Sequence, residues 1–184
     1  MTEQSSKGVS SNPEESNGSS DLGRSDRYLC FQLGTSHYAI PLLAVREIVE
    51  LTELTPVPGS PTHFEGVMNL RGQIVGVGDL RKKLKLPAQP KTTKTAVVIL
   101  DTRTSSAYGV IVDRVTSVRE FAERDFTDTP KSLKNAGAQF LIGVARCEDQ
   151  LVLVIDWTKV FTEEEVKSMK DRSLQKAHSR IDVA

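Results

Sequence analysis

Histidine, cysteine and aspartate are the residue types in this sequence that could bind a metal, attack a substrate or transfer a proton. The three histidines, His37, His63 and His178, lie far apart in different predicted environments. The two cysteines, Cys30 and Cys147, stand singly within apolar stretches. These residues form no close-spaced metal signature, and no nucleophile-elbow or cysteine–histidine signature occurs. The spacing predicts no metal site and no catalytic residue, and hence a protein that is not an enzyme.

Two glycines, Gly76 and Gly78, resemble the start of a dinucleotide-binding fingerprint. The third glycine of that fingerprint is replaced by Arg81, and the pair lies inside a predicted strand rather than between a strand and a helix. Glycines in a strand more often mark a bend or a close backbone approach. We therefore expect no nucleotide or other cofactor at this position.

Two aspartates, Asp79 and Asp156, could be imagined as a catalytic pair, but each follows a predicted strand and precedes a predicted helical turn. A carboxylate at such a position accepts hydrogen bonds from free backbone N–H groups, so both are predicted to be helix caps. The basic run at 81–85 is interpreted as the solvated end of a short helix, and Asp113 as a solvent-facing strand residue.

Charge and hydropathy exclude several classes of partner. Lys plus Arg and Asp plus Glu each number 24, which argues against a nucleic-acid or anionic-membrane binder. No apolar stretch is long enough to span a membrane, and residues 1–27 lack the apolar core of a secretory signal. We expect a cytoplasmic protein in which both cysteines are buried thiols, with a single disulfide as the alternative.

Short apolar runs separated by turn residues indicate an all-β fold. The predicted strands are 27–33, 37–41, 73–79, 94–101, 107–115, 139–147 and 151–157. The segment 41–51 differs, because Leu42, Val45 and Ile48 recur at helical spacing. We predict a short helix there, ended by the prolines that follow.

An internal repeat relates the two halves of the chain. Gly, Gln, Val and Asp residues within 66–79 recur 77 positions later, within 143–156. Ser, Tyr and aliphatic residues within 36–48 recur 70 positions later, within 106–118. The repeat predicts two similar small barrels from halves of about 27–90 and 91–161.

The ends of the chain differ from this folded region. Residues 1–26 are rich in Ser, Gly, Asn and Glu, which predicts a disordered tail. Residues 162–184 are charged with only a thin apolar stripe, which predicts a C-terminal helical tail of marginal stability.

Arg71 and Gly72 form the tight connection between the apolar runs 64–70 and 73–80. A cation at a hairpin tip is either a solvated turn residue or a guanidinium presented to a partner carboxylate on a rigid support. The residues alone leave these two interpretations open.

The segment 66–75, Gly-Val-Met-Asn-Leu-Arg-Gly-Gln-Ile-Val, followed by Asp-Leu-Arg at 79–81, resembles the CheW family of chemotaxis coupling proteins. The similarity covers about 27–161. Further segments that resemble the family are 28–33, 45–48 (its first helix), 108–113 and 141–144. The family usually has proline and an aliphatic residue where this chain has Gly76 and Gly78. These glycines are therefore expected to loosen the strand by about 1 kcal/mol each.

The resemblance implies two five-stranded barrels of the Src-homology-3 type, packed around a shared apolar groove. It also implies an adaptor, associated with membrane-bound receptor arrays, that couples the cytoplasmic tip of a chemoreceptor to the regulatory domain of the histidine kinase CheA. The partner-binding residues that it implies are Arg71, Val45, Glu47, Gly66, Gly109 and Gly143. The alternatives are a CheW-like adaptor of a twitching, gliding or other receptor–kinase pathway, and a small ligand-binding or enzymatic barrel.

Overall fold

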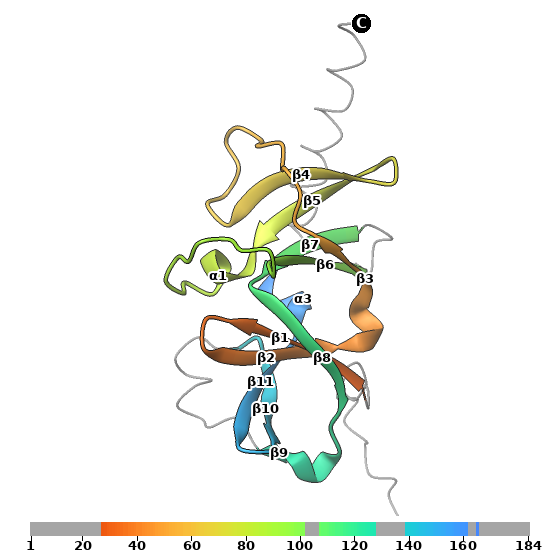
Figure 1. The fold of residues 1–184 in the computed structure, drawn as a ribbon, viewed down its shortest axis with the longest axis vertical. Coiled ribbons are helices and arrows are strands. Elements are labelled where there is room, and N and C mark those ends of the chain that lie inside the picture. Colours follow the sequence, from red (N-terminus) through yellow and green to blue (C-terminus); the bar gives the residue numbers. More distant parts are fainter. Residues whose placement is uncertain (1–26, 102–106, 128–138, 162–164, 166–184) are drawn as a thin grey trace, which may run out of the picture.

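The computed structural model describes residues 27–101, 107–127, 139–161 and 165, which form two curled sheets, one above the other in Figure 1. The predicted N-terminal tail lies outside the described residues, as does the predicted C-terminal helical tail except for Glu165. Within the described ranges, no helix is long and apolar enough to cross a bilayer.

The two sheets form barrels of the Src-homology-3 type, as the family resemblance implied. The six-stranded barrel has the order β8-β1-β2-β11-β10-β9 and the five-stranded barrel the order β3-β6-β7-β5-β4. The six-stranded barrel comprises β1 (Arg27–Leu33), β2 (Ser36–Pro41), β8 (Arg114–Glu120), β9 (Phe126–Thr127), β10 (Leu141–Cys147) and β11 (Gln150–Ile155). The five-stranded barrel comprises β3 (Val45–Glu50), β4 (Phe64–Leu70), β5 (Gln73–Asp79), β6 (Ala96–Asp101) and β7 (Ala107–Val112). The short strand β9 gives one barrel a sixth strand, where the resemblance implied five.

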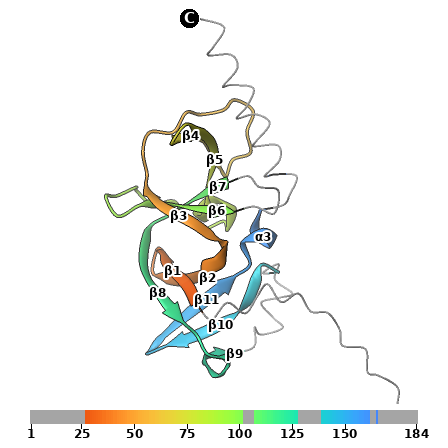
Figure 2. The same ribbon diagram turned by 90° about the vertical axis from the view of Figure 1, so that its right-hand side faces the viewer.

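Short helical segments connect these strands. They are the 3-10 turns Leu42–Ala44 and Glu123–Asp125 and the helices α1 (Leu80–Lys83) and α3 (Trp157–Val160). Helix α3 lies at the level between the two sheets in both views (Figure 1, Figure 2). The predicted strands agree with β1, β2, β5, β6, β7, β10 and β11, some with shifted ends, whereas β4, β8 and β9 were not among the predicted strands.

The helix predicted over 41–51 is wrong. Only Leu42–Ala44 form a 3-10 turn, and Val45–Glu50 form β3, which pairs antiparallel with β6. A register shift between Val45 and Glu47 inserts an extra residue into this strand. The apolar spacing fits a helix as well as a bulged strand, and pairing with a strand about fifty residues away decides between them.

The internal repeat is present in the strand pairing itself. Strands β5 and β7 are parallel, with Gly76 opposite Tyr108, and β11 and β2 are parallel, with Leu153 opposite Tyr38. These pairs are related by the offsets 77 and 70 found in the sequence. The register shift between Phe64 and Gly66 likewise recurs 77 residues later, between Leu141 and Gly143.

The two repeat halves exchange strands. The first half supplies β1 and β2 to the six-stranded barrel and β3, β4 and β5 to the other. The second half supplies β6 and β7 to the five-stranded barrel and β8, β9, β10 and β11 to the six-stranded barrel. Each barrel therefore contains strands from both halves, so the halves 27–90 and 91–161 do not correspond to separate barrels.

A shared core joins the barrels, and each barrel also has a smaller core of its own. Members of the shared core include Phe31, Leu100, Tyr108 and Phe161, which come from both sheets and from the end of α3. Burial of this apolar surface is the main source of stability for such a fold. The exchange of strands means that neither barrel can close its sheet without the other half of the chain.

The predicted caps are confirmed. Asp79 Oδ1 accepts a hydrogen bond from the backbone N–H of Arg81 at 2.8 Å, and Asp156 Oδ1 accepts one from that of Thr158 at 3.1 Å. Both carboxylates thus satisfy free N–H groups at the start of a one-turn helix, α1 or α3.

Arg81 is buried rather than solvated, which corrects the interpretation of the basic run. Its side chain is only 8% exposed, and Nη1 lies 2.5 Å from Oδ2 of Asp113. Its Nε and Nη2 donate to the carbonyl oxygen of Pro87. Asp113 also accepts from the backbone N–H of Gly34 at 2.6 Å, so it is not a free solvent-facing strand residue. This cluster joins α1 of one barrel to the β1–β2 turn of the other.

Gly78 has a packing role that the sequence did not reveal. It is buried, and a Cβ atom at this position would lie 2.0 Å from the hydroxyl oxygen of Tyr108. The large aromatic ring of Tyr108 therefore occupies the volume that a side chain at residue 78 would need. The glycine is matched to its neighbour, which argues against the loosening expected for this strand.

Candidate partner-binding site

The β4–β5 hairpin positions Arg71. Leu70 pairs with Gln73, so Arg71 and Gly72 are the two loop residues, with positive φ angles of 51° and 86°. Two-residue loops with positive φ at both positions match the twist of the flanking strands. Asn69 Oδ1 accepts a hydrogen bond from the Gly72 N–H at 2.8 Å and braces the loop. The tight connection predicted from the sequence is confirmed, and it gives Arg71 a rigid base.

Strand β3 brings Glu47 to this hairpin. Nη2 of Arg71 lies 3.0 Å from Oε2 of Glu47, and the two side chains are 82% and 21% exposed. An exposed ion pair of this kind stabilises a fold by about 1 kcal/mol or less. A guanidinium has five N–H donors, so Arg71 can hold Glu47 and still donate to a second carboxylate.

Val45 lies on the same strand as Glu47 but in a different environment. Its side chain is half-buried and packs against the shared core, opposite Leu100 of β6. The structure therefore brings Arg71 and Glu47 into contact, whereas Val45 supports the strand that carries Glu47.

The three glycines predicted to bind a partner are all buried. A Cβ atom on Gly66 would lie 2.4 Å from the backbone oxygen of Thr55, and one on Gly109 would lie 2.8 Å from Val97 Cγ1. At Gly143 it would lie 3.2 Å from a ring carbon of Phe126. These glycines pack within the barrels and are not at the surface with Arg71 and Glu47.

Exposed apolar side chains were missed by the sequence reasoning. Leu43 is 87% exposed, and two related pairs are also exposed: Ile48 with Val118, and Ile74 with Leu151. The members of each pair are related by the repeat offsets of 70 and 77. The repeat could have identified these positions, because the same outward-facing strand site is apolar in both halves. Large exposed apolar side chains of this kind often mark contact surfaces.

Side chains suited to metal chemistry do not gather in the part of the chain that the structure describes. Within those residues, no three His, Cys, Asp or Glu side chains form a group that could hold a metal ion. Cys30 and Cys147 are both free thiols, the first buried and the second half-buried.

Comparison with known proteins places the whole described region in one family. The CheW-like domain matches residues 27–165. The sequence is 30% identical to the chemotaxis protein CheW of Treponema pallidum, over 76% of this chain and 84% of that protein. It is also 30% identical to the chemotaxis protein CheW of Thermotoga maritima, over 76% of this chain and 89% of that protein. The crystal structure of the scaffolding protein TtCheW from Thermoanaerobacter tengcongensis superimposes with a TM-score of 0.67 at 26% identity, covering 77% of this chain and 91% of that one.

Proposed function

This chain belongs to the CheW-like domain family, and from that premise we propose that it is a non-catalytic scaffold in a chemotaxis system. It couples chemoreceptors to the histidine kinase CheA by binding both. The observation that carries the proposal is the match of the family over residues 27–165, together with relatives that are named chemotaxis and scaffolding proteins.

The site geometry supports a role in binding rather than catalysis. The Arg71–Glu47 pair presents charge from a braced hairpin and an adjoining strand, which is a rigid platform for a protein partner. We propose that Arg71 and Glu47 touch a partner directly. Val45, Gly66, Gly109 and Gly143 act on binding through the packing that holds this platform in shape.

The proposed mechanism is a shift of a kinase equilibrium. A scaffold that binds receptor and kinase together lets the receptor conformation bias the conformation of the kinase. Each single contact can be modest, because binding at two sites raises the effective concentration of the second partner. Such a protein works in the cytoplasm, at the inner ends of membrane receptors.

Reconstitution tests the proposal. CheA autophosphorylation is measured with receptor-containing membranes, in the presence and absence of the full chain. We expect the chain to raise kinase activity only when receptor is present, and attractant to reverse the rise. A protein that binds neither the receptor signalling fragment nor the CheA regulatory domain, when each is titrated alone, is not such a scaffold.

A further inference from the structure

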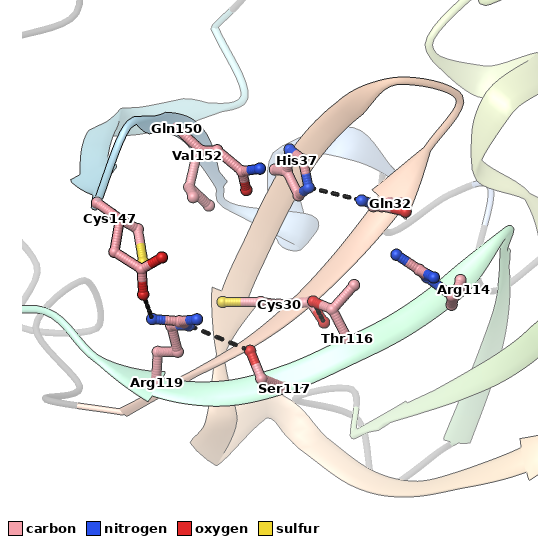
Figure 3. Close-up of a pocket in the computed structure, with 11 residues that line it drawn as sticks. Cys30, Gln32, His37, Arg114, Thr116, Ser117, Arg119, Cys147, Gln150 and Val152 are labelled. Carbon is pink, nitrogen blue, oxygen red and sulfur yellow. Dashed lines mark hydrogen bonds and ion pairs between the residues drawn. The ribbon is translucent and has the colours of Figure 1, made fainter.

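The six-stranded barrel contains a cavity of about 290 Å³ between β1, β2, β8, β10 and β11 (Figure 3). Its floor includes the buried Cys30 and Val152, and its walls are mainly polar. Arg114 and Arg119 lie on the β8 side, and His37 and Gln150 lie on the opposite side (Figure 3). This volume is at the lower end of the range typical of small-molecule sites.

The five-stranded barrel provides an internal comparison, because the positions equivalent to Cys30 and Cys147 carry larger apolar side chains there. Cys147 pairs with Gln150 as Leu70 pairs with Gln73, and these pairs are related by the offset of 77. Cys30 pairs with Ser117 as Ile99 pairs with Glu47, so Ile99 occupies the place of Cys30.

The comparison explains why the cavity exists. Leu70 and Ile99 pack in the core of the five-stranded barrel, next to Met68. The six-stranded barrel has Cys147, Cys30 and Ala145 at these three places. Each of these three residues is smaller than its equivalent, so the five-stranded barrel has a filled core where the six-stranded barrel is open. Functional sites often depart from the packing that would be most stable. Small and polar residues in place of a packed core are a departure of this kind.

A β-bulge turns several side chains of β8 toward the cavity. Cys30 pairs with Ser117 and Phe31 with Val115, which leaves Thr116 as the extra residue. Its hydroxyl donates to the backbone oxygen of Cys30 at 3.0 Å. Because the bulge breaks the strict alternation of the strand, both Arg114 and Arg119 line the same cavity, although residues five positions apart in a regular strand face opposite sides.

The charges around the cavity favour an anion. Arg119 donates to Glu148 Oε1 at 3.2 Å, and Glu148 is the only carboxylate among the described lining residues. In the described part of the chain, Arg114 has no ion-pair partner. Burial raises the pKa of the Cys30 thiol, so this group is neutral at pH 7 and does not oppose a negative ligand.

We propose that this cavity binds a small oxyanion, a phosphate or a compact carboxylate, held between the guanidinium groups of Arg114 and Arg119. The amide of Gln150 and the hydroxyl group of Ser117 supply neutral donors around it. Guanidinium groups bind both classes of oxyanion through paired hydrogen bonds. This site is separate from the Arg71–Glu47 surface, and it lies in the other barrel.

NMR titration of the full-length protein tests the site. Sodium phosphate and sodium succinate are added separately at constant ionic strength, with sodium chloride as the reference. We expect saturable shifts of the backbone amides of Ser117, Arg119 and Gln150 with a Kd of about 1 mM or tighter for at least one anion. Saturation by phosphate alone or by succinate alone identifies the ligand class. No saturable response to either anion overturns the proposal.

Two kinds of variant locate the binding. Arg119→Gln should weaken binding by at least about tenfold, whereas Arg146→Gln, the same charge change on an exposed residue of β10 outside the cavity, should leave it within about twofold. Cys147→Leu, which copies Leu70 of the other barrel, should abolish binding while the spectrum keeps its native dispersion. Equal losses in Arg119→Gln and Arg146→Gln, or unchanged affinity in a folded Cys147→Leu protein, would show that the anion does not bind in the cavity.

Discussion

Arg71 and Glu47 form an ion pair, 3.0 Å between Nη2 and Oε2, that ties the β4–β5 hairpin to β3. The other barrel has a related ion pair with the charges reversed, although its strand partner lies two residues beyond the position equivalent to Glu47. Glu148, at the equivalent turn position with a φ of 55°, lies 3.2 Å from Arg119 of β8. The two barrels thus present opposite charges at related hairpin tips. A partner that recognises one tip by charge is repelled by the other, which helps to distinguish two otherwise similar surfaces.

Arg71→Ala tests the proposed contact with a partner. Alanine at a φ of 51° has the same backbone cost as arginine, so only the exposed ion pair is lost, and the free energy of unfolding should fall by about 0.5 kcal/mol. If Arg71 anchors an interface, its removal should weaken binding to one partner by about 2 kcal/mol, roughly thirtyfold. Calorimetric titrations with a receptor signalling fragment and with the CheA regulatory domain measure the two affinities separately.

The matched control for this substitution is Arg146→Ala, which removes an exposed arginine from the other barrel. It should change neither affinity. Unchanged binding of the Arg71→Ala protein to both partners would remove Arg71 from the interface. A fall in stability of several kcal/mol would instead assign it a structural role.

Gly66→Ala should destabilise the five-stranded barrel by about 3 kcal/mol. Gly66 has a φ of 144°, and a Cβ atom there would lie 2.4 Å from the backbone oxygen of Thr55, which cannot rotate away. The Thr55 and Val67 backbones also exchange two hydrogen bonds of 2.9 Å beside it, and these would be disturbed. Urea denaturation provides the free energy of unfolding.

Gly72→Ala is the comparison for Gly66→Ala. Gly72 also has positive φ, at 86°, but nothing lies within 4 Å of a Cβ atom there. Only the backbone conformation opposes alanine, which costs about 1 kcal/mol. Similar losses of stability in the two variants would show that the close approach to Thr55 does not affect the free energy of unfolding.

The Arg81–Asp113 pair should show strong energetic coupling. Asp113→Ala leaves the buried Arg81 guanidinium without its carboxylate and should cost about 3 kcal/mol. The double variant with Arg81→Met should lose less than the sum of the single variants, with a coupling energy of about 2 kcal/mol. A double-mutant cycle in urea measures this quantity.

An ion pair at the surface provides the reference for that double-mutant cycle. Arg27 and Glu120 are 60% and 76% exposed and lie 3.9 Å apart, so their coupling should stay below about 0.5 kcal/mol. If both pairs gave the same small value, the junction between α1 and the β1–β2 turn would not depend on the buried charge pair.

His63 should make stability fall on acidification. Burial, and to a lesser extent the charge of Lys83, lowers the pKa of His63, while Glu165, whose Oε1 lies 3.5 Å from Nε2, partly opposes this effect. The unfolded chain then binds a proton at higher pH than the folded chain does. The contribution of His63 is therefore complete above the unfolded pKa of about 6.5 and is lost as the pH falls below it, by at most about 1.4 kcal/mol per pH unit.

Denaturation midpoints between pH 5 and pH 8 check this dependence. His63→Gln should flatten the curve between pH 5 and pH 7. A wild-type curve that rises toward pH 5, or a His63→Gln curve that keeps the wild-type slope, would contradict the assignment.

Local and repeated features could be predicted from the sequence alone. Short apolar runs bounded by turn residues identified β1 and β5, and the position of Asp79 and Asp156 between strand and helical turn identified two caps. The hairpin at Arg71 and Gly72 was evident from the same kind of local pattern. These features depend on residues only a few positions apart, so a short stretch of chain is enough to determine them.

Tertiary structure alone decided the features that depend on distant partners. Pairing with β6 made Val45–Glu50 a strand, although its apolar spacing also suits a helix. The exchange of strands between the repeat halves and the burial of Arg81 against Asp113, 32 residues away, had no local signal. The same holds for the cavity, which arises where side chains from five strands fail to fill a barrel. A backbone or charged group finds its lowest free energy with whichever partner the closed fold places beside it, and a short segment of sequence does not specify that partner.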